Sequence, residues 1–470
     1  MDQLKPHDIA LPTRPKGSTI TQWLYDELRR AILEGRLRRG AALPPTRRLA
    51  QDYVISRRIV VNVFNRLRDE GYLETRAGSG ARVSASLPED YTPPPPPHPP
   101  PPPPPPPPPR IRPFRPVEPA LAEFPIETWA RLTARITKSL GLAHLAAGSP
   151  AGEPALREAI AAHLGASRGV ACHPAQIVIV SGAQQGLDLL ARALLRPGDK
   201  VWMEDPGYIE AAEIFRRAGA AIVPVPVDAD GLDFAAGLKA CPRPRAVYLT
   251  PAHQFPTGVT LALPRRLEIL NWARRHNVAI FEDDYDSEFR FSGRPLPAMK
   301  GLPGADQVCL VGTFNKALFP ALRLGYLALP DQWLDPLLRL RSLVERHPAV
   351  LPQQVLAAFI DQGQFATHLR RMRRLYADRL QALRQEIGHH LEGVLELPEI
   401  EAGLNIPARL LNGMSSTEAA ESAANHDVEV WPLDRFSLSR RRHPALLLGF
   451  AAFDRRAIRR GAAALAQALR

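Results

Sequence analysis

Cysteine is scarce in this chain: Cys172, Cys241 and Cys309 are widely spaced and odd in number. Such a pattern offers neither a disulfide framework nor a metal-binding motif, and is typical of a reducing cytosol. No run of about eighteen apolar residues occurs, which argues against a membrane-spanning helix. The first thirty residues are charged and lack the apolar core of a secretory leader. We therefore expect a cytoplasmic protein without a membrane partner.

Acidic residues are fewer than basic ones, and the formal net charge is +12. The excess is concentrated in residues 1–86, which hold sixteen Lys or Arg against nine Asp or Glu. A compact basic module suggests a polyanionic partner such as DNA. An arginine-rich coding background would give a similar excess, so charge alone does not decide between the two.

Proline is abundant, and residues 93–109 are proline at every position except His98. This tract has few backbone donors and cannot build a core, so we expect a stiff polyproline rod about 50 Å long. A ligand for SH3- or WW-type domains is the less favoured alternative. The tract predicts three parts: a small domain over 1–86, a proline-rich linker over 87–116 and a large domain over 117–470.

The first part has the order of a winged helix-turn-helix. Apolar spacing, capping residues and glycines predict helices over 21–34, 47–53 and 56–70, then short strands at 72–75 and 81–83. The second helix of such a unit enters the major groove, and the glycines of the wing allow close approach to the sugar-phosphate backbone. The expected DNA-contacting residues are Arg47, Ser56, Arg57, Arg58, Asn62, Gly78 and Gly80.

Four short motifs occur in order within this part: LPPTRRLA at 43–50, ISR at 55–57, DEGYL at 69–73 and GSG at 78–80. Together they resemble the GntR-type winged helix, and the match covers roughly residues 19–85. The resemblance implies sequence-specific binding to double-stranded DNA. A structural helical domain with a solvated basic face is the remaining alternative.

The part after the linker alternates apolar strands with helices. Strands are expected at 176–180, 200–203, 221–225, 246–250, 279–281, 308–311 and 323–329. This order predicts a large α/β domain with a mainly parallel sheet. The helix-rich tail from about Pro352, with strand candidates near Leu395 and at 446–450, predicts a smaller α+β subdomain.

The most specific motif is GTFNKALFPALRLGY at 312–326, which follows an apolar strand. A lysine packed among apolar residues loses its proton readily and then forms a Schiff base with an aldehyde. Arg323 and Thr313 are suited to holding a phosphate near Lys316. A single loop lysine is usually solvated, but phosphate ligands at this spacing favour a pyridoxal phosphate site.

A second motif, FEDDYDSEF at 281–289, stands at the end of a strand, where α/β folds bind ligands. Pyridoxal phosphate chemistry needs an acid beside the pyridine nitrogen. Asp283 is the candidate acid, and Tyr285 is expected to reach the phenolate oxygen of the cofactor. The neighbouring carboxylates would also suit a divalent metal, but the Lys316 motif argues against that alternative, and we expect no metal site.

Three further motifs are SGAQQG at 181–186, DPGY at 205–208 and TPAHQFPTG at 250–258. With the two above, they resemble fold type I pyridoxal phosphate-dependent aminotransferases, and their particular forms are similar to the MocR-type subfamily of GntR regulators. That resemblance spans both domains. It implies pyridoxal 5'-phosphate as cofactor, Lys316 as the Schiff-base lysine, Asp283 as the pyridinium partner and Tyr208 as the stacking ring. The implied phosphate ligands are Arg323, Thr313, Gly182, Ala183 and Gln184.

Departures from the aminotransferase pattern bear on activity. Phe255 stands where aminotransferases carry an asparagine, so His253 is expected to bind the cofactor, with Gln254 as the alternative. The strand at 446–450 lacks the usual carboxylate-binding arginine before it. Arg435 is the expected replacement, and its competitors are the arginines at 440–442.

These features favour a transcription regulator that senses an amine or amino acid through its cofactor pocket. An active aminotransferase with a DNA-binding appendage is the alternative, although the departures argue against efficient turnover. An inactive scaffold fused to a DNA-binding domain is less favoured still. Fold type I sites normally lie between subunits, so we expect a head-to-tail homodimer.

Overall fold

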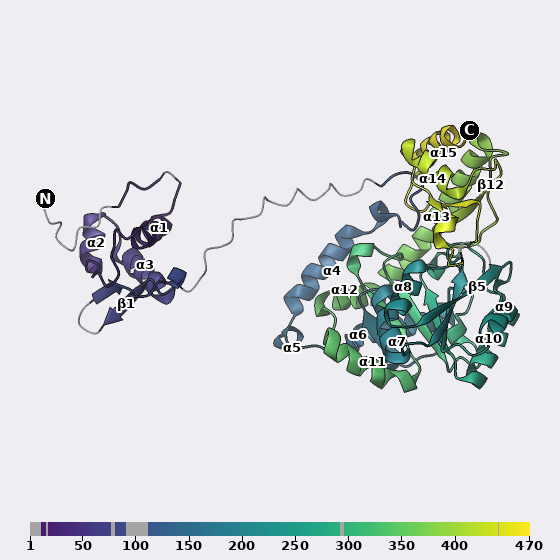
Figure 1. Ribbon diagram of the computed structural model, residues 1–470, viewed down its shortest axis with the longest axis horizontal. Helices are drawn as coiled ribbons and strands as arrows, with labels where there is room; N and C mark the ends of the chain where they lie inside the picture. The colour runs from purple at the N-terminus through teal and green to yellow at the C-terminus, as the bar shows by residue number, and fades with distance from the viewer. Residues whose placement is uncertain (1–10, 16, 77–79, 91–110, 292–295, 440) are drawn as a thin grey trace. The chain divides into compact units, whose positions relative to one another are not determined.

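The computed structural model describes residues 11–15, 17–76, 80–90, 111–291, 296–439 and 441–470 (Figure 1). The chain divides into two compact units, residues 1–109 and 110–470, which we consider separately. The polyproline rod and Gly78 lie outside the described residues. No helix in the described part of the chain is long and apolar enough to cross a membrane.

The first unit is a three-helix domain followed by a hairpin. Its elements are α1 (Ile20–Leu33), α2 (Thr46–Asp52), α3 (Arg57–Asp69), β1 (Leu73–Arg76) and β2 (Gly80–Val83), with β1 and β2 antiparallel. Leu24, Leu28, Val63 and Leu67 are buried in its core. The predicted winged helix-turn-helix order is confirmed.

Capping accounts for where the helices begin. The Ser56 side chain accepts a hydrogen bond from the Arg58 amide at 3.3 Å, as expected for an N-cap. The second helix begins one residue before the predicted range: Thr46 is its first residue, and Pro45 precedes it without a side-chain cap. Proline fixes φ near helical values, so it starts a helix without an extra donor.

Both units extend into the segment predicted as linker. Leu87 is buried in the core of the first unit, and Asp90 pairs with Arg39 at 2.6 Å. On the other side, Phe114 is fully buried in the second unit, and its carbonyl accepts a hydrogen bond from the Gly449 amide. The chain therefore packs on the second unit before residue 117. The three-part division itself stays a prediction.

The second unit is built on an eight-stranded sheet in the order β3-β10-β9-β8-β7-β4-β5-β6. The core strands β4, β5, β7, β8 and β9 are parallel, whereas β10 is antiparallel to both neighbours. The strands are β3 (Ile177–Val180), β4 (Lys200–Asp205), β5 (Ala221–Asp228), β6 (Gly231–Leu232), β7 (Ala246–Leu249), β8 (Ala279–Asp284), β9 (Val308–Thr313) and β10 (Gly325–Ala328).

Helices cover both faces of this sheet. Ile177 and Ile179 of β3 belong to one apolar cluster, and Val178 and Val180 belong to another, as expected for a strand buried on both sides. The helices are α4 (Ile126–Ser139), α5 (Leu142–Leu145), α6 (Pro154–Arg168), α7 (Ala183–Leu194), α8 (Ile209–Arg217), α9 (Phe234–Ala240), α10 (Leu263–His276), α11 (Asp331–Val344) and α12 (Val350–Asp361). The predicted α/β domain is confirmed.

A smaller α+β subdomain completes the unit (Figure 1, yellow-green). Its antiparallel sheet has the order β11-β12-β14-β13. The elements are α13 (Gln364–His390), β11 (Leu395–Glu396), β12 (Asn405–Leu410), α14 (Ser416–Asn425), β13 (Trp431–Pro432), β14 (Ala445–Gly449) and α15 (Arg455–Leu469). The strands expected near Leu395 and at 446–450 are therefore present.

Candidate functional site

A cavity of about 340 Å³ lies where β4, β7, β8 and β9 end, the edge at which parallel sheets bind ligands. Nine of the residues predicted from the sequence line it together. They are Ala183, Gln184, Tyr208, Asp283, Tyr285, Thr313, Lys316, Arg323 and Arg435. Gly182 borders this group without lining the cavity, and His253 lies away from it.

Lys316 follows β9 and is largely buried. Its amine donates a hydrogen bond of 2.8 Å to the backbone carbonyl of Val117. Burial lowers the pKa of Lys316, although the carboxylates of Glu118 and Asp286 act in the opposite direction. A lowered pKa leaves more of the amine uncharged near neutral pH, which is the form that attacks a carbonyl carbon.

Asp283 is buried at the end of β8. Tyr248 donates a hydrogen bond of 2.8 Å to its Oδ2, while its Oδ1 has no partner among the described residues. Burial raises the pKa of Asp283 to about 7. A buried oxygen without a partner is costly, so it indicates a donor supplied by a bound molecule.

The neighbouring carboxylates have other tasks. Glu282 accepts hydrogen bonds from the amides of Met299 and Lys300, and Asp284 pairs with Arg168 at 2.8 Å. Side chains alternate across a strand, so Asp283 alone of the three points into the cavity. Within the described residues no group of His, Cys, Asp or Glu side chains is arranged to hold a metal ion.

The turn before α7 lies next to two polar side chains, the amide of Asn315 and the guanidinium of Arg323, and the three form a cradle. Gly182 has φ +98°, and a Cβ added there would come within 3.3 Å of Asn315 Nδ2 and 3.6 Å of the Arg323 guanidinium. Asn315 also has a buried Oδ1 without a partner among the described residues. A helix N-terminus beside a guanidinium is suited to binding a phosphate dianion.

Aromatic rings bound the cavity on another side. Tyr208 accepts a hydrogen bond of 3.1 Å from Gln184 Nε2, and its ring packs edge-on against Phe255. Phe255 packs in turn against Tyr285 and Phe436. The position that carries asparagine in aminotransferases is thus part of an apolar wall.

His253 does not take the place of that asparagine. It is buried, and its Nδ1 lies 2.9 Å from both Asp286 Oδ2 and the Tyr285 hydroxyl. Gln254 Nε2 likewise donates hydrogen bonds to two backbone carbonyls and to the carboxylate of Glu204. His253 does not line the cavity and contacts the lining residue Tyr285 instead. Direct binding of His253 to the cofactor stays a prediction.

Arg435 reaches the cavity from the smaller subdomain. Its segment is docked by Asp205, whose carboxylate accepts hydrogen bonds from the amides of Leu438 and Ser439. The guanidinium stacks over the Trp431 ring at 5.0 Å and has no ion pair among the described residues. An unpaired guanidinium at a cavity wall is available to a carboxylate.

The sequence did not single out Tyr248, Val117, Trp431 or Phe436, all of which line the cavity. Tyr248 lies in the middle of an apolar strand, where a tyrosine looks like core. Val117 and Phe436 come from remote segments, and only tertiary packing brings them here. The one available signal was the hydroxyl of Tyr248 in an apolar strand, because a buried hydroxyl needs a polar partner such as Asp283.

In the first unit, the predicted DNA-contacting side chains share one exposed end. Arg57 and Arg58 start α3, Asn62 lies one turn later, and Arg47 is the second residue of α2. All four are exposed, and Arg57 Nε lies 3.4 Å from the Thr46 hydroxyl, so the beginnings of α2 and α3 are adjacent. Gly80 has φ +74°, the left-handed region that favours glycine at the hairpin.

Comparison with known proteins bears on both units. Residues 20–83 match the family described as bacterial regulatory proteins, gntR family, and residues 123–417 match aminotransferase class I and II. The chain is 39% identical over 451 residues to the probable rhizopine catabolism regulatory protein MocR of Rhizobium meliloti, covering 93% of this chain and 91% of that protein. The chain belongs to the MocR-type subfamily of GntR transcription regulators.

Other MocR-type relatives extend the comparison. The regulator TauR of Rhodobacter capsulatus is 35% identical and covers 76% of this chain and 77% of its own length. The pyridoxine biosynthesis regulator PdxR of Corynebacterium glutamicum is 31% identical, with 81% of each chain covered. The predicted family and its class of function, a DNA-binding transcription regulator, are confirmed.

Solved structures agree for the second unit of this MocR-type regulator. The α-aminoadipate aminotransferase LysN of Thermus thermophilus, complexed with N-(5'-phosphopyridoxyl)-L-leucine, is 28% identical with a TM-score of 0.71 and covers 76% of this chain and 92% of that one. The predicted fold type I aminotransferase domain is confirmed. Pyridoxal 5'-phosphate is the cofactor that this domain implies, and the unpartnered Asp283 oxygen and the Gly182 cradle fit it.

Proposed function

We propose that this protein senses a primary amine or amino acid in the pyridoxal phosphate pocket of its second unit and thereby changes its binding to an operator. The observation that carries this proposal is the convergence of Lys316, Asp283 and Arg323 on one cavity in a chain that also carries a GntR-type domain. When bound, the cofactor supplies an aldehyde that condenses with primary amines and a ring that withdraws electrons.

The residues of the cavity divide these tasks. Lys316 would provide the attacking amine, and Asp283 would hold the proton of the ring nitrogen. Arg323, Thr313 and Asn315, with the amides of Gly182, Ala183 and Gln184, would bind the phosphate. Tyr208 would stack on the ring, and Tyr285, whose hydroxyl lies 2.9 Å from His253 Nδ1, would bind the phenolate oxygen.

Arg435 is proposed to bind the carboxylate of an amino-acid effector. It enters the cavity from the smaller subdomain, so an effector that engages both Arg435 and the cofactor connects the two subdomains. An effector changes DNA binding only if it binds two arrangements of the protein with different affinities. Contacts to two subdomains provide such a difference, because their strength depends on the relative position of the subdomains.

In the first unit, Arg47, Ser56, Arg57, Arg58 and Asn62 are proposed to meet phosphates and base edges, and Gly78 and Gly80 to let the wing approach the backbone. We place the protein in the cytoplasm, where the operator is. The proline tract is proposed to set the reach of each winged helix.

A head-to-tail homodimer is part of the proposal. Leu142 and Leu145 of α5 are 87% and 72% exposed, and Leu343 near the end of α11 is 87% exposed. Large apolar side chains that are this exposed in one chain are suited to contact with a second copy. The exposed side chain of Arg323 in a single chain agrees with a pocket that a partner completes.

Titration of the purified protein with candidate amines, followed by its visible spectrum, tests the pocket. We expect a yellow protein whose absorbance shifts with amines, and a Lys316→Ala variant that lacks the parent absorbance. Reductive trapping with borohydride and peptide mapping must label Lys316. A label on another lysine would overturn the assignment.

An active aminotransferase is the second candidate, because the cavity retains a lysine, an acid and a phosphate cradle. Single-turnover and steady-state assays separate the two functions. A sensor converts bound amino acid slowly or not at all, whereas an enzyme releases 2-oxo acid through many turnovers. The Phe255 wall favours the sensor.

A further inference from the structure

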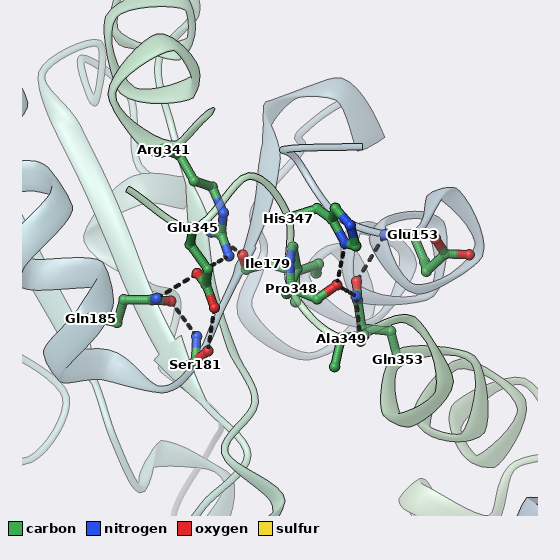
Figure 2. A network of polar contacts seen from close by, with 10 residues as sticks. All are labelled: Glu153, Ile179, Ser181, Gln185, Arg341, Glu345, His347, Pro348, Ala349 and Gln353. Atoms are coloured by element: carbon green, nitrogen blue, oxygen red, sulfur yellow. Dashed lines mark hydrogen bonds and ion pairs between the residues drawn. The ribbon is translucent and has the colours of Figure 1, made fainter. Parts of the chain in front are cut away.

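We propose that Glu345, held by Arg341, positions the Ser181–Gln185 turn and so sets the affinity of the pocket for a phosphorylated ligand. Neither residue lines the cavity. The inference rests on the proposed function, since it concerns the cradle for the cofactor phosphate. Figure 2 shows the contacts: Glu345 lies between Arg341 on one side and Ser181 and Gln185 on the other.

The Ser181–Gln185 turn has an internal hydrogen bond and is also hydrogen-bonded to Glu345. The Ser181 amide donates to Gln185 Oε1 at 2.6 Å, and Gln185 Nε2 donates to Glu345 Oε2 at 2.6 Å. The Ser181 hydroxyl lies 3.5 Å from Glu345 Oε1 and donates to it. Both ends of the turn therefore contact one carboxylate, which fixes the backbone of residues 182–184 between them.

Arg341 fixes that carboxylate in turn. Its side chain is fully buried in the described chain, and one guanidinium nitrogen donates to Glu345 Oε2 at 3.1 Å. The other terminal nitrogen donates to the carbonyl of Ile179 in β3. Arg341 is 0% exposed and Glu345 is 33% exposed, so separating the pair would leave the buried guanidinium without its carboxylate. Glu345 is thus anchored to the strand that leads into the turn.

The chain after Glu345 is held as well. Gln353 Nε2 donates to the carbonyls of Pro348 and Ala349, at 3.2 and 2.8 Å, and its Oε1 accepts from the Glu153 amide at 2.8 Å (Figure 2). The connection from α11 to α12 is therefore held before Glu345 by Arg341 and after it by Gln353. Without these contacts the carboxylate would move with its loop.

The orientation of this turn matters because its backbone amides bind an anion only when they point toward the same position. Gly182 has φ +98° and is the N-cap residue before α7, and its backbone lies close to the side chains of Asn315 and Arg323. A small rotation of the turn would misdirect the amides and weaken phosphate binding, while leaving the ring and the lysine untouched. Glu345 and Arg341 are positioning residues, since they act through Gln185.

Two variants separate positioning from folding. Glu345→Gln removes the carboxylate, and Gln185→Leu removes the tie to the turn while leaving the Arg341–Glu345 pair intact. Asp335→Asn is the matched control, because Asp335 forms an i,i+4 pair with Arg339 on the same helix but is 82% exposed. Each apo-protein is titrated with pyridoxal phosphate and with pyridoxal, which lacks the phosphate, and its thermal midpoint is measured.

We expect pyridoxal phosphate to bind about five- to ten-fold more weakly to Glu345→Gln and Gln185→Leu, as for the removal of one or two hydrogen bonds. Pyridoxal should bind as to the parent, and Asp335→Asn should match the parent with both ligands. Equal loss of affinity for both ligands, or unchanged affinity for pyridoxal phosphate, overturns the inference. A parent that binds neither ligand would instead refute the proposed function.

Discussion

The amine of Lys316 donates a hydrogen bond of 2.8 Å to the backbone carbonyl of Val117, in the segment by which the chain enters the second unit. Val117 is itself held, because its amide donates to Asn405 Oδ1 at 2.5 Å in the smaller subdomain. The reactive lysine thus contacts a segment eight residues beyond the proline tract. A cofactor held covalently by Lys316 would replace a donor of that hydrogen bond, and so would change the contact with Val117.

The carboxylate of Glu118, in the same segment as Val117, affects the pKa of Lys316. Glu118 raises the pKa of Lys316 against the lowering by burial. Glu118→Gln should therefore lower that pKa further and speed attachment of pyridoxal phosphate at pH 7 by about two- to five-fold. Stopped-flow absorbance measures the rate.

The effect should vanish above the pKa of the parent lysine, where both amines are uncharged. Glu127→Gln, an exposed carboxylate on α4, is the control. An unchanged or slower rate in Glu118→Gln at pH 7 would contradict this electrostatic account of Lys316.

Asp283 gives the apo-protein a pH-dependent stability. Its pKa is raised to about 7 in the folded protein, against about 3.9 when unfolded. The group therefore contributes stability below pH 4 that is lost as the pH rises through 7. Asp283→Asn should stabilise the apo-protein by about 1–3 kcal/mol at pH 8 and much less at pH 5.

Chemical denaturation of apo-protein at both pH values measures this difference. The same variant should bind pyridoxal phosphate less well, since the ring nitrogen loses its acid. A stability difference that is independent of pH would show that the Asp283 carboxyl is not the group responsible.

The start of α3 should carry the DNA affinity. Arg47→Ala and Arg57→Ala should each make the salt dependence of operator binding shallower by about 0.9 in log–log terms for every phosphate that the arginine neutralises. Arg68→Ala, about 16 Å away at the other end of α3, is the control. Fluorescence anisotropy over a salt series measures the slopes, and two arginine variants that match the parent would refute this docking.

The exposed leucine side chains of α5 and α11 should contribute to dimer formation. Leu343→Asp places a charge on a side chain that is 87% exposed in one chain, so folding of the monomer should be unaffected while dimerisation weakens at least ten-fold. Light scattering against concentration measures this. A parent protein that is monomeric at the concentrations used for DNA binding would contradict the proposed dimer.

The linker makes a related prediction about reach. Deleting about half of the proline tract should leave pyridoxal phosphate binding intact, because no cavity residue lies there. It should weaken binding to two spaced half-sites far more than to one, since the second contact depends on effective concentration. Equal loss on single and double half-sites would show that the tract does not set the spacing.

Much of this architecture was readable from local signals. Short continuous apolar runs located the strands of the large sheet, and Ser56 and Gly71 marked the ends of α3. The lysine motif identified Lys316, Thr313 and Arg323 because all three lie within one loop. What local pattern did not give was contact between remote segments.

Val117 and Tyr248 illustrate that limit. Val117 contacts Lys316 across 199 residues of chain, and Tyr248 contacts Asp283 across 35. Neither residue type is unusual where it stands. His253 is a related case: no local pattern indicated that its ring would contact Asp286 and Tyr285 rather than line the cavity.

The central claim is that an amine bound at Lys316 changes operator binding. The direct measurement is the dissociation constant for an operator fragment, selected from random DNA by the protein itself, over a titration with amines that shift the cofactor spectrum. We predict a change in that constant for the parent and none for Lys316→Ala, whose DNA affinity without amine should equal that of the parent. A parent whose spectrum responds while its DNA affinity stays constant, or a Lys316→Ala variant that responds equally, would contradict the account.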